Sequence, residues 1–357
     1  MILGSKLRIG LQFVALAALA ASTPPSLREA ATTSGVLVGT AVRAYALSEP
    51  AYAATLAHEY NMVEPENEMK WGIVRPSRER FDFAQADQIV RFAEAHGMKI
   101  RGHCLVWDHY NPDWLARGNF SPEQLSQLLQ EHITTEMKHY AGHVFAWDVV
   151  NEALDANGNP KDSIWYNKPG IGLSGKGTAY VEQAIRWAHD ADPNALLFYN
   201  EAEGEGLNRK SDAIYAMLKD FRNRGTPIDG IGLQLHISRL DYDIDALARN
   251  IERLTKLGLQ VHITELDVSL PVDAKGEARK EDLQRQGQIY AGVVHACTKS
   301  PGCIAIQTWG FTDKYSWIGS HSQGRNGAAL PFDREYKPKL AYDSIIGEFA
   351  FKHQTTH

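Results

Sequence analysis

Apolar and polar residues follow two different periods along this chain. Short runs rich in Val, Ile and Leu are typical of strands buried on both faces, and longer stretches with apolar residues every three or four positions are typical of helices. The expected strands cover residues 35–42, 61–65, 98–106, 145–151, 195–199, 230–236, 259–265 and 304–309. The expected helices cover residues 47–60, 83–96, 122–139, 180–188, 211–224, 244–257, 281–298 and 340–349.

This regular alternation of strands and helices predicts an α/β fold with a parallel sheet. Eight rounds predict a sheet closed on itself, the (β/α)8 TIM barrel, and an open doubly wound sheet is the alternative. The chain has 357 residues, a length that single barrels reach through loop insertions. It contains no internal repeat and no Pro/Ser-rich linker, so we expect one catalytic domain over residues 35–352 and a tail over residues 353–357.

The N-terminus has the pattern of a secretory signal. Lys6 and Arg8 precede an apolar run at residues 13–21, and small residues follow. An ordinary membrane span needs about 20 apolar residues, so this run is too short, although an uncleaved anchor is the alternative. We expect a signal peptide over residues 1–22, a leader segment over residues 23–34, and a secreted protein, either extracellular or periplasmic.

Composition and charge argue against some partners. The formal net charge is −6 and there is no basic block, which argues against nucleic acid and anionic membrane surfaces. We expect no membrane contact after signal cleavage, and a monomer. The chain has 8 Trp and 14 Tyr, many for one domain. Aromatic rings suit stacking on sugars, but they are also ordinary core residues.

The chain has three cysteines, Cys104, Cys297 and Cys303. In an exported protein an odd number suggests one bridge and one free thiol. Cys297 and Cys303 flank a turn-like segment and are the expected disulfide, whereas Cys104 lies in an apolar strand pattern and is expected to be buried. No cysteine has the spacing of a zinc site, so we expect no metal.

Residues 170–175 read Gly-Ile-Gly-Leu-Ser-Gly, which matches the GxGxxG pattern of nucleotide-binding sites. The segment before it is not an expected strand. Position 177 is Gly, where a phosphate-binding loop needs Ser or Thr. We therefore expect a flexible loop here, and no nucleotide cofactor.

Two of the apolar runs end in a glutamate. Asn151 and Glu152 follow one run, and Glu265 ends another. In a (β/α)8 barrel the carboxyl ends of the strands carry the chemistry, and two facing glutamates can perform acid/base and nucleophilic catalysis on one bond. Taken alone, each glutamate is more often a helix-start or surface residue, so the surrounding motifs decide between the two interpretations.

Six separated motifs lie at or just past expected strand ends. They are residues 65–71 (PENEMKW), 101–107 (RGHCLVW), 147–153 (WDVVNEA), 232–236 (GLQLH), 263–267 (ITELD) and 308–317 (TWGFTDKYSW). With these motifs the chain resembles glycoside hydrolase family 10, the retaining endo-β-1,4-xylanases, over nearly everything after residue 27. The resemblance implies hydrolysis of internal β-1,4-xylosidic bonds in xylan and xylo-oligosaccharides through a covalent glycosyl-enzyme intermediate, without metal or cofactor.

The resemblance also implies roles for single residues. Glu152 would be the acid/base, Glu265 the nucleophile, and Asn151 would hold the 2-hydroxyl of the reacting sugar. His236 and Asp267 would orient the nucleophile. Further sugar contacts are implied for Glu66, Asn67 and Lys70 on the non-reducing side, and for His103, Trp107, Gln234, His236, Trp309 and Trp317 around the reacting sugar.

The chain departs from the family pattern at several positions near the expected site. The departures are Asp-His-Tyr at residues 108–110 in place of His-Ser-Gln, Asn-Glu-Ala at residues 200–202 in place of Asn-Asp-Tyr, a longer loop at residues 168–178, and Ile318 in place of Arg. Because Asp108 lies next to an expected strand end, we expect its charge to raise the pKa of Glu152. The alternative is that Asp108 caps a loop.

Two rival functions remain open. A retaining β-glucanase would use the same pair of glutamates, and a catalytically silent carbohydrate-binding protein would bind sugars without turnover. Relative hydrolysis of xylan and carboxymethylcellulose distinguishes a β-glucanase from a xylanase. Turnover of an aryl xylobioside distinguishes an enzyme from a carbohydrate-binding protein.

Overall fold

The computed structural model describes residues 25–355, with the side chains of residues 25–350. Eight parallel strands form a closed barrel. They are β1 (Leu37–Val42), β2 (Met62–Pro65), β3 (Lys99–Val106), β4 (Ala146–Asn151), β5 (Leu196–Glu201), β6 (Gly230–Leu233), β8 (Gln260–Val268) and β10 (Cys303–Thr308). Because β10 pairs with both β1 and β8, the predicted TIM barrel is confirmed and an open sheet is excluded.

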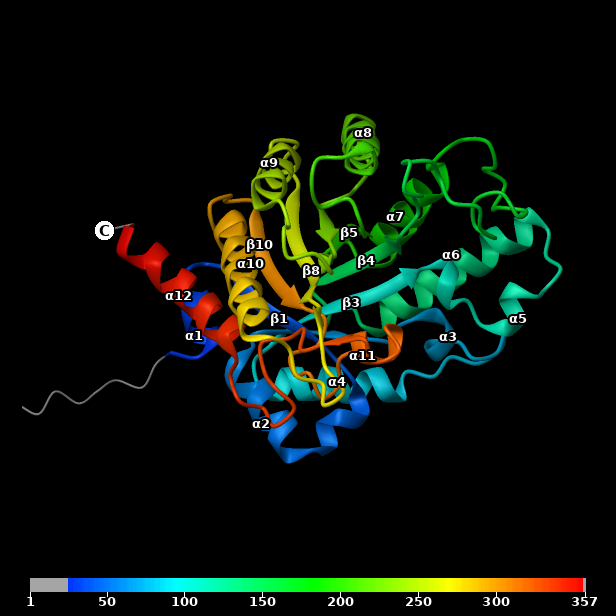
Figure 1. Cartoon of the computed structure of the whole chain (residues 1–357). Helices are drawn as coiled ribbons and strands as arrows, with labels where there is room; N and C mark the ends of the chain where they lie inside the picture. Colours follow the sequence, from blue (N-terminus) through cyan, green and yellow to red (C-terminus); the bar gives the residue numbers. More distant parts are fainter. Residues whose placement is uncertain (1–24, 356–357) are drawn as a thin grey trace, which may run out of the picture.

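Helices surround the barrel (Figure 1). The longer ones are α2 (Pro50–Glu59), α4 (Ala84–Ala95), α6 (Pro122–His139), α7 (Ala179–Ala191), α8 (Arg209–Asn223), α9 (Ile244–Thr255), α10 (Lys280–Thr298) and α12 (Leu340–Thr355), and each coincides with an expected helix. In α9, Leu247, Ile251 and Leu254 follow helical spacing and are buried. At the start of α6, the side chains of Ser121 and Gln124 form a capping box, which fixes where this helix begins.

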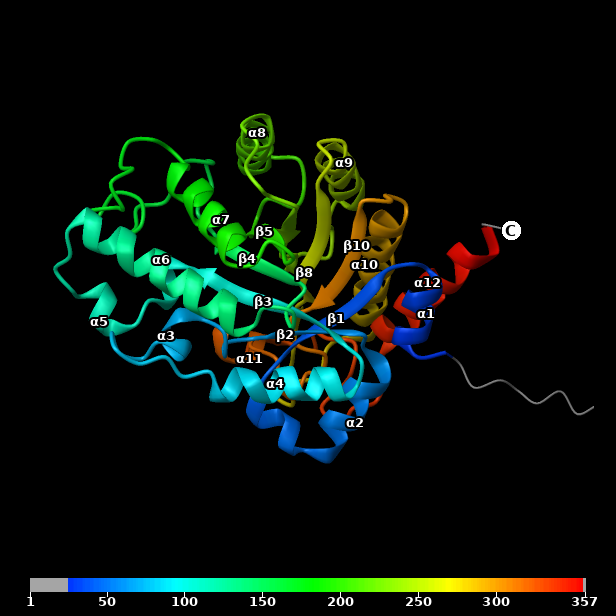
Figure 2. The same cartoon turned by 180° about the vertical axis from the view of Figure 1, so that it is seen from behind.

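The segment expected to be a leader is part of the fold. Helix α1 (Leu27–Thr33) begins with a capping box in which Ser26 Oγ accepts a hydrogen bond from the backbone N–H of Glu29 and the Glu29 carboxylate accepts one from Ser26. Leu27 is buried, and α1 lies beside α12 in both views (Figures 1 and 2). The domain boundary expected at residue 35 is therefore too late, because apolar residues that cover the barrel begin at Leu27.

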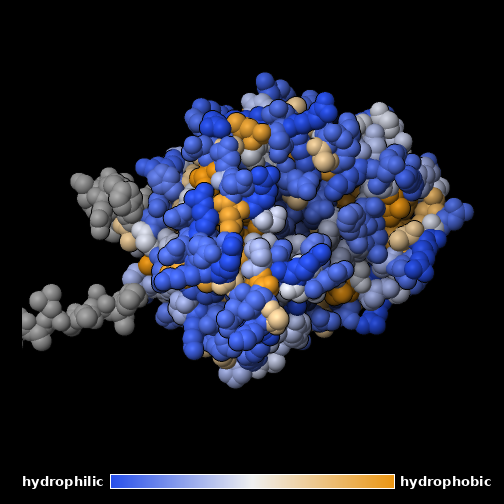
Figure 3. All heavy atoms as spheres, viewed as in Figure 1, coloured by the Kyte–Doolittle hydropathy of each residue, from blue (hydrophilic) through white to orange (hydrophobic). Residues whose placement is uncertain are grey.

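Two segments were expected at the ends of the chain, a signal peptide and a C-terminal tail. The expected signal peptide lies outside the described residues. Helix α12 ends at Thr355, so most of the segment expected to be a tail continues this helix. Within residues 25–355, no helix combines the length and apolar character that crossing a membrane requires. On the face shown in Figure 3, polar side chains predominate and apolar ones gather in small separate groups.

Several short elements in the connections were not predicted. They are η1 (Ala44–Ser48), η2 (Asp108–Tyr110), α3 (Trp71–Val74), α5 (Asp113–Ala116), α11 (Ile318–His321), β7 (His236–Ile237), β9 (Leu270–Pro271) and β11 (Asn326–Gly327). The strand expected at residues 230–236 is split into β6 and β7, because Leu235 has a φ of 65°, in the left-handed region. Residues 170–175 lie in the loop before α7 with no strand ahead of them, as expected.

The predicted disulfide is present. Cys297 near the end of α10 and Cys303 at the start of β10 are bonded, with their Cα atoms 5.1 Å apart. Cys104 is a free, buried thiol, also as predicted. Since Cys303 begins its strand, the bridge lies at the end of the barrel opposite the carboxyl ends of the strands. It therefore stabilises the barrel away from the catalytic end.

Candidate active site

A cleft of about 540 Å³ opens at the mouth of the barrel where the carboxyl ends of the parallel strands meet. The cleft is lined by every side chain that the sequence predicted to contact substrate, namely Glu66, Asn67, Lys70, His103, Trp107, Asn151, Glu152, Gln234, His236, Glu265, Trp309 and Trp317. Asp267, predicted to orient the nucleophile, lies behind His236. The structure thus brings together residues that are up to about two-thirds of the chain apart in sequence.

Glu152 follows the last residue of β4 and has a φ of 57°. A left-handed backbone is uncommon for residues other than glycine and often occurs at functional sites. In the cleft, Oε1 of Glu152 accepts a hydrogen bond from Nε2 of Gln234 at 3.2 Å, and Oε2 accepts one from Nε1 of Trp107 at 3.3 Å. Nζ of Lys161 lies 3.5 Å from Oε2, so the carboxyl of Glu152 is surrounded by donors.

The electrostatic surroundings of Glu152 set the pKa of its carboxyl. Burial raises the pKa of the Glu152 carboxyl, but hydrogen bonds from its neighbours and the charge of Lys161 outweigh burial and hold this pKa below its usual value. The largest causes of this shift do not include Asp108, so the expectation that its charge raises the pKa of Glu152 stays a prediction. Oδ1 of Asp108 accepts from Nδ2 of Asn111 at 3.1 Å and from the backbone N–H of Ile164 at 3.4 Å, so Asp108 ties two loops together.

Replacing Lys161 by Met should raise the pKa of Glu152, because the change removes a positive charge that favours the ionised carboxylate. The acid would then stay protonated to higher pH. The alkaline limb of kcat/KM for an oligosaccharide should therefore move toward base, with the acid limb little changed. The control is Lys168→Met, because Lys168 pairs with Asp162 at 2.9 Å and not with Glu152. An alkaline limb that stays in place in Lys161→Met would contradict the prediction.

Glu265, in β8, is buried and has a donor on each carboxylate oxygen. Nδ2 of Asn200 donates to Oε1 at 2.8 Å, and Nε2 of His236 lies 3.1 Å from Oε2. Nδ1 of His236 lies 2.9 Å from Oδ2 of Asp267, which also accepts from Nε1 of Trp317 at 2.8 Å. Burial alone would lower the pKa of His236, but the charges of Asp267 and Glu265 hold it well above its usual value. A protonated His236 therefore donates to both carboxylates and fixes the orientation of Glu265.

The two glutamates belong to one hydrogen-bond network. Nε2 of Gln234 donates to Oε1 of Glu152 and, at 3.2 Å, to Oδ1 of Asn151. Oδ1 of Asn151 also accepts from Nδ2 of Asn200 at 3.0 Å, and this same amide nitrogen donates to Glu265. Three amide side chains therefore set the position of one carboxyl relative to the other.

One end of the cleft carries charged and amide side chains from the segment after β2. Nζ of Lys70 donates to Oδ1 of Asn67 at 3.1 Å. Both carboxylate oxygens of Glu66 accept from Arg43, each at 2.6 Å. These contacts hold donors and acceptors in fixed directions, which is what recognition of sugar hydroxyls requires.

Aromatic side chains form the walls beside this end of the cleft. Nζ of Lys70 lies 4.8 Å from the ring centroid of Trp107, 5.0 Å from that of Tyr110 and 5.5 Å from that of Trp309. The rings of Trp107 and Tyr110 are nearly parallel, with centroids 5.9 Å apart. The ammonium group is thus held among rings whose faces can also pack against the CH groups of a sugar.

Some cleft residues escaped the sequence-based prediction. His109, Tyr110, Ala202, Glu203 and Glu205 also line the cleft. All five lie within or just after the departures from the family pattern, which were noted without being assigned a contact. Their positions immediately after the ends of β3 and β5 are the signal that would have placed them at the mouth of the barrel.

The role of Lys161 also had a signal in the sequence. Asn157 and Gly158 form a dipeptide that is typical of a tight turn. In the structure the chain folds back after Asp155, and the backbone N–H of Lys161 donates to the carbonyl oxygen of Ala153 at 2.8 Å. This return brings the Lys161 side chain beside Glu152.

Comparisons with known proteins agree with this geometry. The model of the family described as "Glycosyl hydrolase family 10" matches residues 26–348. Endo-1,4-beta-xylanase B of Thermotoga neapolitana is 40% identical over 294 residues, covering 82% of this chain and 82% of that protein. An endo-1,4-beta-xylanase of Agaricus bisporus is 34% identical, covering 86% of this chain and 89% of that protein.

Two solved structures are also close to this one. The structure of native xylanase 10B from Thermotoga maritima has a TM-score of 0.87 at 39% identity, and covers 92% of this chain and 99% of its own. That of xylanase 10B from Thermotoga petrophila RKU-1 in complex with xylobiose has a TM-score of 0.87 at 38% identity, and covers 93% of this chain and 99% of its own. With a family model matched over nearly the whole described chain and the pair of glutamates at the barrel mouth, the chain belongs to glycosyl hydrolase family 10.

Proposed function

We propose that this protein is an endo-1,4-β-xylanase that cleaves internal bonds of xylan with retention, through a covalent glycosyl-enzyme intermediate. The observation that carries the proposal is the pair Glu152 and Glu265, joined across the cleft by the amide side chains of Gln234, Asn151 and Asn200. The names of the relatives, endo-1,4-beta-xylanases at 34–40% identity, support xylan as the substrate.

In the first step, Glu265 attacks the anomeric carbon while Glu152 gives its proton to the leaving glycosidic oxygen. The surroundings of Glu265 suit the role of nucleophile. Glu265 is held by donors on both oxygens, so it is oriented as a carboxylate nucleophile. The side chain of Glu152 is 17% exposed, so it can exchange its proton with solvent between turnovers.

In the second step, ionised Glu152 takes a proton from a water molecule, which attacks the anomeric carbon and releases Glu265. Lys161 and Gln234 both favour the ionised form of Glu152, the form that this step requires. Asn151 binds the 2-hydroxyl of the reacting sugar. This role is supported by its contacts with Gln234 and Asn200, whose amides also donate to the two carboxyls.

The substrate binds along the cleft on both sides of the catalytic pair. The side bearing Glu66, Asn67 and Lys70 takes the non-reducing end of the chain, and the side bearing Ala202 and Glu203 takes the leaving portion. Sugar units bind on each side of the scissile bond, and cleavage is internal, which the names of the endo-1,4-beta-xylanase relatives support. Trp107, Trp309 and Trp317 pack against sugar faces around the reacting unit.

The test is hydrolysis of xylan and of carboxymethylcellulose in parallel, with NMR of the first product formed. We expect clear preference for xylan and initial release of the β-anomer. Equal or better hydrolysis of carboxymethylcellulose would favour a β-glucanase, and initial α-anomer would exclude retention. If the protein binds xylan but does not turn over an aryl xylobioside, the result would favour a catalytically silent carbohydrate-binding protein.

Export and a monomeric state are further parts of the proposal. The apolar run and small residues at the N-terminus support export, with cleavage near residue 22. N-terminal sequencing of the exported protein measures the cleavage site directly. Size-exclusion chromatography with light scattering measures the mass, which should be that of one chain.

A further inference from the structure

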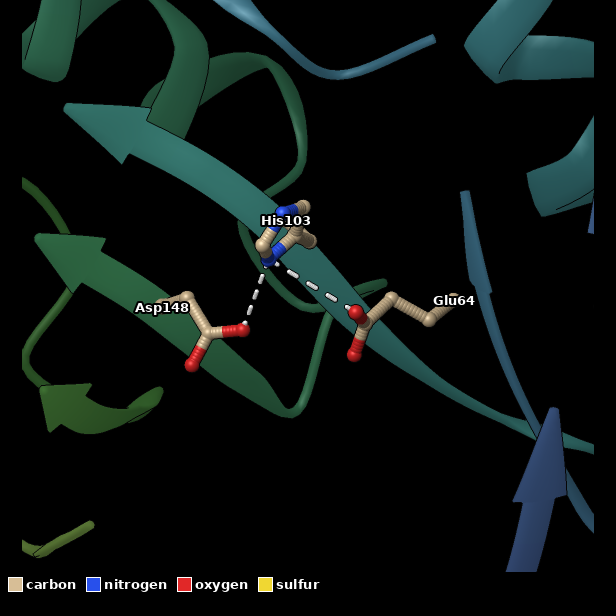
Figure 4. A group of neighbouring side chains, drawn as sticks. All are labelled: Glu64, His103 and Asp148. Carbon is tan, nitrogen blue, oxygen red and sulfur yellow. Dashed lines mark hydrogen bonds and ion pairs between the residues drawn. The ribbon is translucent and has the colours of Figure 1, made fainter. Parts of the chain in front are cut away.

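Three buried titratable side chains from neighbouring strands point toward one another beneath the cleft (Figure 4). They are Glu64 of β2, His103 of β3 and Asp148 of β4, each at most 1% exposed. Nδ1 of His103 lies 3.0 Å from Oδ2 of Asp148 and 3.6 Å from Oε1 of Glu64. His103 also lines the cleft, so this cluster links the interior of the barrel to the sugar-binding site.

A fourth side chain, Arg101, already supplies a positive charge to this cluster. The three possible ligand atoms lie within 4.8 Å of one another, which raises the question of a metal ion. However, Nε of Arg101 lies 3.1 Å from Oε2 of Glu64, and Nη2 donates to Oδ1 of Asp148. Because one guanidinium bridges both carboxyls, we interpret the group as a proton and hydrogen-bond cluster.

Positive charge around Glu64 is scarce. Arg101 and His103 face it from β3, Asp148 from β4, Glu265 and His262 from β8, and the uncharged Gln307 from β10. Nδ1 of His262 lies 2.7 Å from Nη1 of Arg101 and accepts its hydrogen bond, so His262 adds no charge. One guanidinium therefore faces several carboxyl groups in the buried interior of the barrel.

Asp148 takes the larger share of the donors. It accepts from Nε of Arg101 at 3.3 Å, from Nη2 of Arg101, and from Nδ1 of His103. For Glu64, Oε2 accepts from Nε2 of Gln307 at 2.7 Å. Its Oε1 has no hydrogen-bond partner among the described side chains and backbone. An ionised carboxylate with one oxygen left unpaired in a dry interior is strongly unfavourable.

We propose that Glu64 holds a proton in the resting enzyme and is a positioning residue for His103. The proton resides on Oε1, the oxygen without a donor, and removes the unpaired charge from the barrel interior. Asp148 is then the carboxylate that receives the Nδ1–H of His103, which fixes the ring and leaves Nε2 for the cleft. Burial raises the pKa of Glu64, the charge of Asp148 adds to it, and Arg101 opposes both without cancelling them.

The direct test is the infrared difference spectrum between the unchanged protein and Glu64→Gln at neutral pH. We expect loss of a C=O band of a protonated carboxyl that shifts in heavy water, with no loss of carboxylate bands. The control is Glu252→Gln, because Glu252 is exposed on α9 and pairs with Lys256 at 2.6 Å. This control should lose carboxylate bands. The same loss in Glu64→Gln would overturn the proposal.

The positioning role rests on the proposed xylanase function and is tested by kinetics on an aryl xylobioside whose leaving group needs no acid. Gln resembles a protonated carboxyl, so Glu64→Gln should keep kcat/KM within about threefold of the unchanged protein at neutral pH. Glu64→Leu leaves Gln307 and Arg101 without their acceptor and should lose about tenfold or more, mainly through KM. As pH rises, the unchanged protein should lose activity at lower pH than Glu64→Gln, because the glutamine cannot ionise.

Two results would overturn the positioning role. One is a correctly folded Glu64→Gln protein, by circular dichroism, with more than about tenfold lower kcat/KM at neutral pH. The other is an identical alkaline decline in the unchanged protein and Glu64→Gln. Absence of turnover in the unchanged protein would refute the xylanase function instead, while the infrared experiment, which needs no substrate, would still decide whether Glu64 is protonated.

Discussion

Glu265→Ala should lower kcat by at least about 10⁴-fold on every substrate, including aryl xylobiosides with good leaving groups. The reason is that Glu265 supplies the oxygen that forms the glycosyl-enzyme bond, and the side chains in contact with it cannot replace that oxygen. Asn200 and His236 contact Glu265, but one is an amide and the other is held between two carboxylates. A good leaving group removes the need for an acid but leaves the need for a nucleophile, so the loss should not depend on the leaving group.

Azide offers a stereochemical check on Glu265→Ala. It can occupy the space that the carboxylate leaves and attack the anomeric carbon from that side in a single displacement, which should give an α-glycosyl azide. The control is Glu205→Gln, because Glu205 is another buried acid lining the cleft, and it accepts from the backbone N–H groups of Glu203 and Leu235. It should keep turnover. Near-normal activity in Glu265→Ala would remove Glu265 from the nucleophile's role.

The strands and the meeting of Glu152 and Glu265 at the barrel mouth could be predicted because both depend on local pattern. Apolar runs mark strands buried on two faces, and their carboxyl ends meet at one mouth in a parallel barrel. Glu152 and Glu265 follow such runs directly, so their shared location needed no knowledge of side-chain packing. The same holds for the disulfide, since a short turn leaves Cys297 and Cys303 close whatever the rest of the chain does.

Residues whose role depends on pairing register or loop path could not be predicted in this way. Glu64 reads as one more strand position, and only the alignment of β2, β3 and β4 brings it close to His103 and Asp148. In the sheet, His103 is the register partner of Asp148. Two residues 45 positions apart are adjacent for this reason, and nothing in the local pattern of either one indicates it.

The charge of Lys161 beside Glu152 was not predicted for a related reason. Asp108 is close in sequence to a strand end, and proximity alone suggested that it acts on Glu152. The hydrogen bonds of Asp108 to Asn111 and Ile164 direct its carboxylate to loop structure, and a lysine from a folded-back loop takes the place beside Glu152. The path of this loop, which the local pattern around Glu152 does not show, brings Lys161 to the carboxyl.

Glu152→Ala should lower kcat/KM on xylan by about 10²- to 10⁴-fold, the usual contribution of a general acid. On aryl xylobiosides with good leaving groups, the first step should remain fast, because the departing phenolate needs no proton. The second step should then become limiting, because no base activates water. A pre-steady-state burst of phenol followed by slow turnover is the expected measurement. The control is Lys161→Met, which keeps the carboxyl and should show no such separation of the two steps.

Azide should restore the second step in Glu152→Ala, because an anion needs no general base to attack the glycosyl-enzyme. Attack on an intermediate that Glu265 has already formed with inversion is a second inversion, so the product should be the β-glycosyl azide. The two variants thus predict opposite anomers from the same reagent, α for Glu265→Ala and β for Glu152→Ala. An α-azide from Glu152→Ala, or unchanged turnover of xylan, would show that Glu152 is not the acid/base. The side chains of Glu152 and Glu265 are held by a shared set of amides, so each variant's thermal unfolding should be compared with that of the unchanged protein before activity is interpreted.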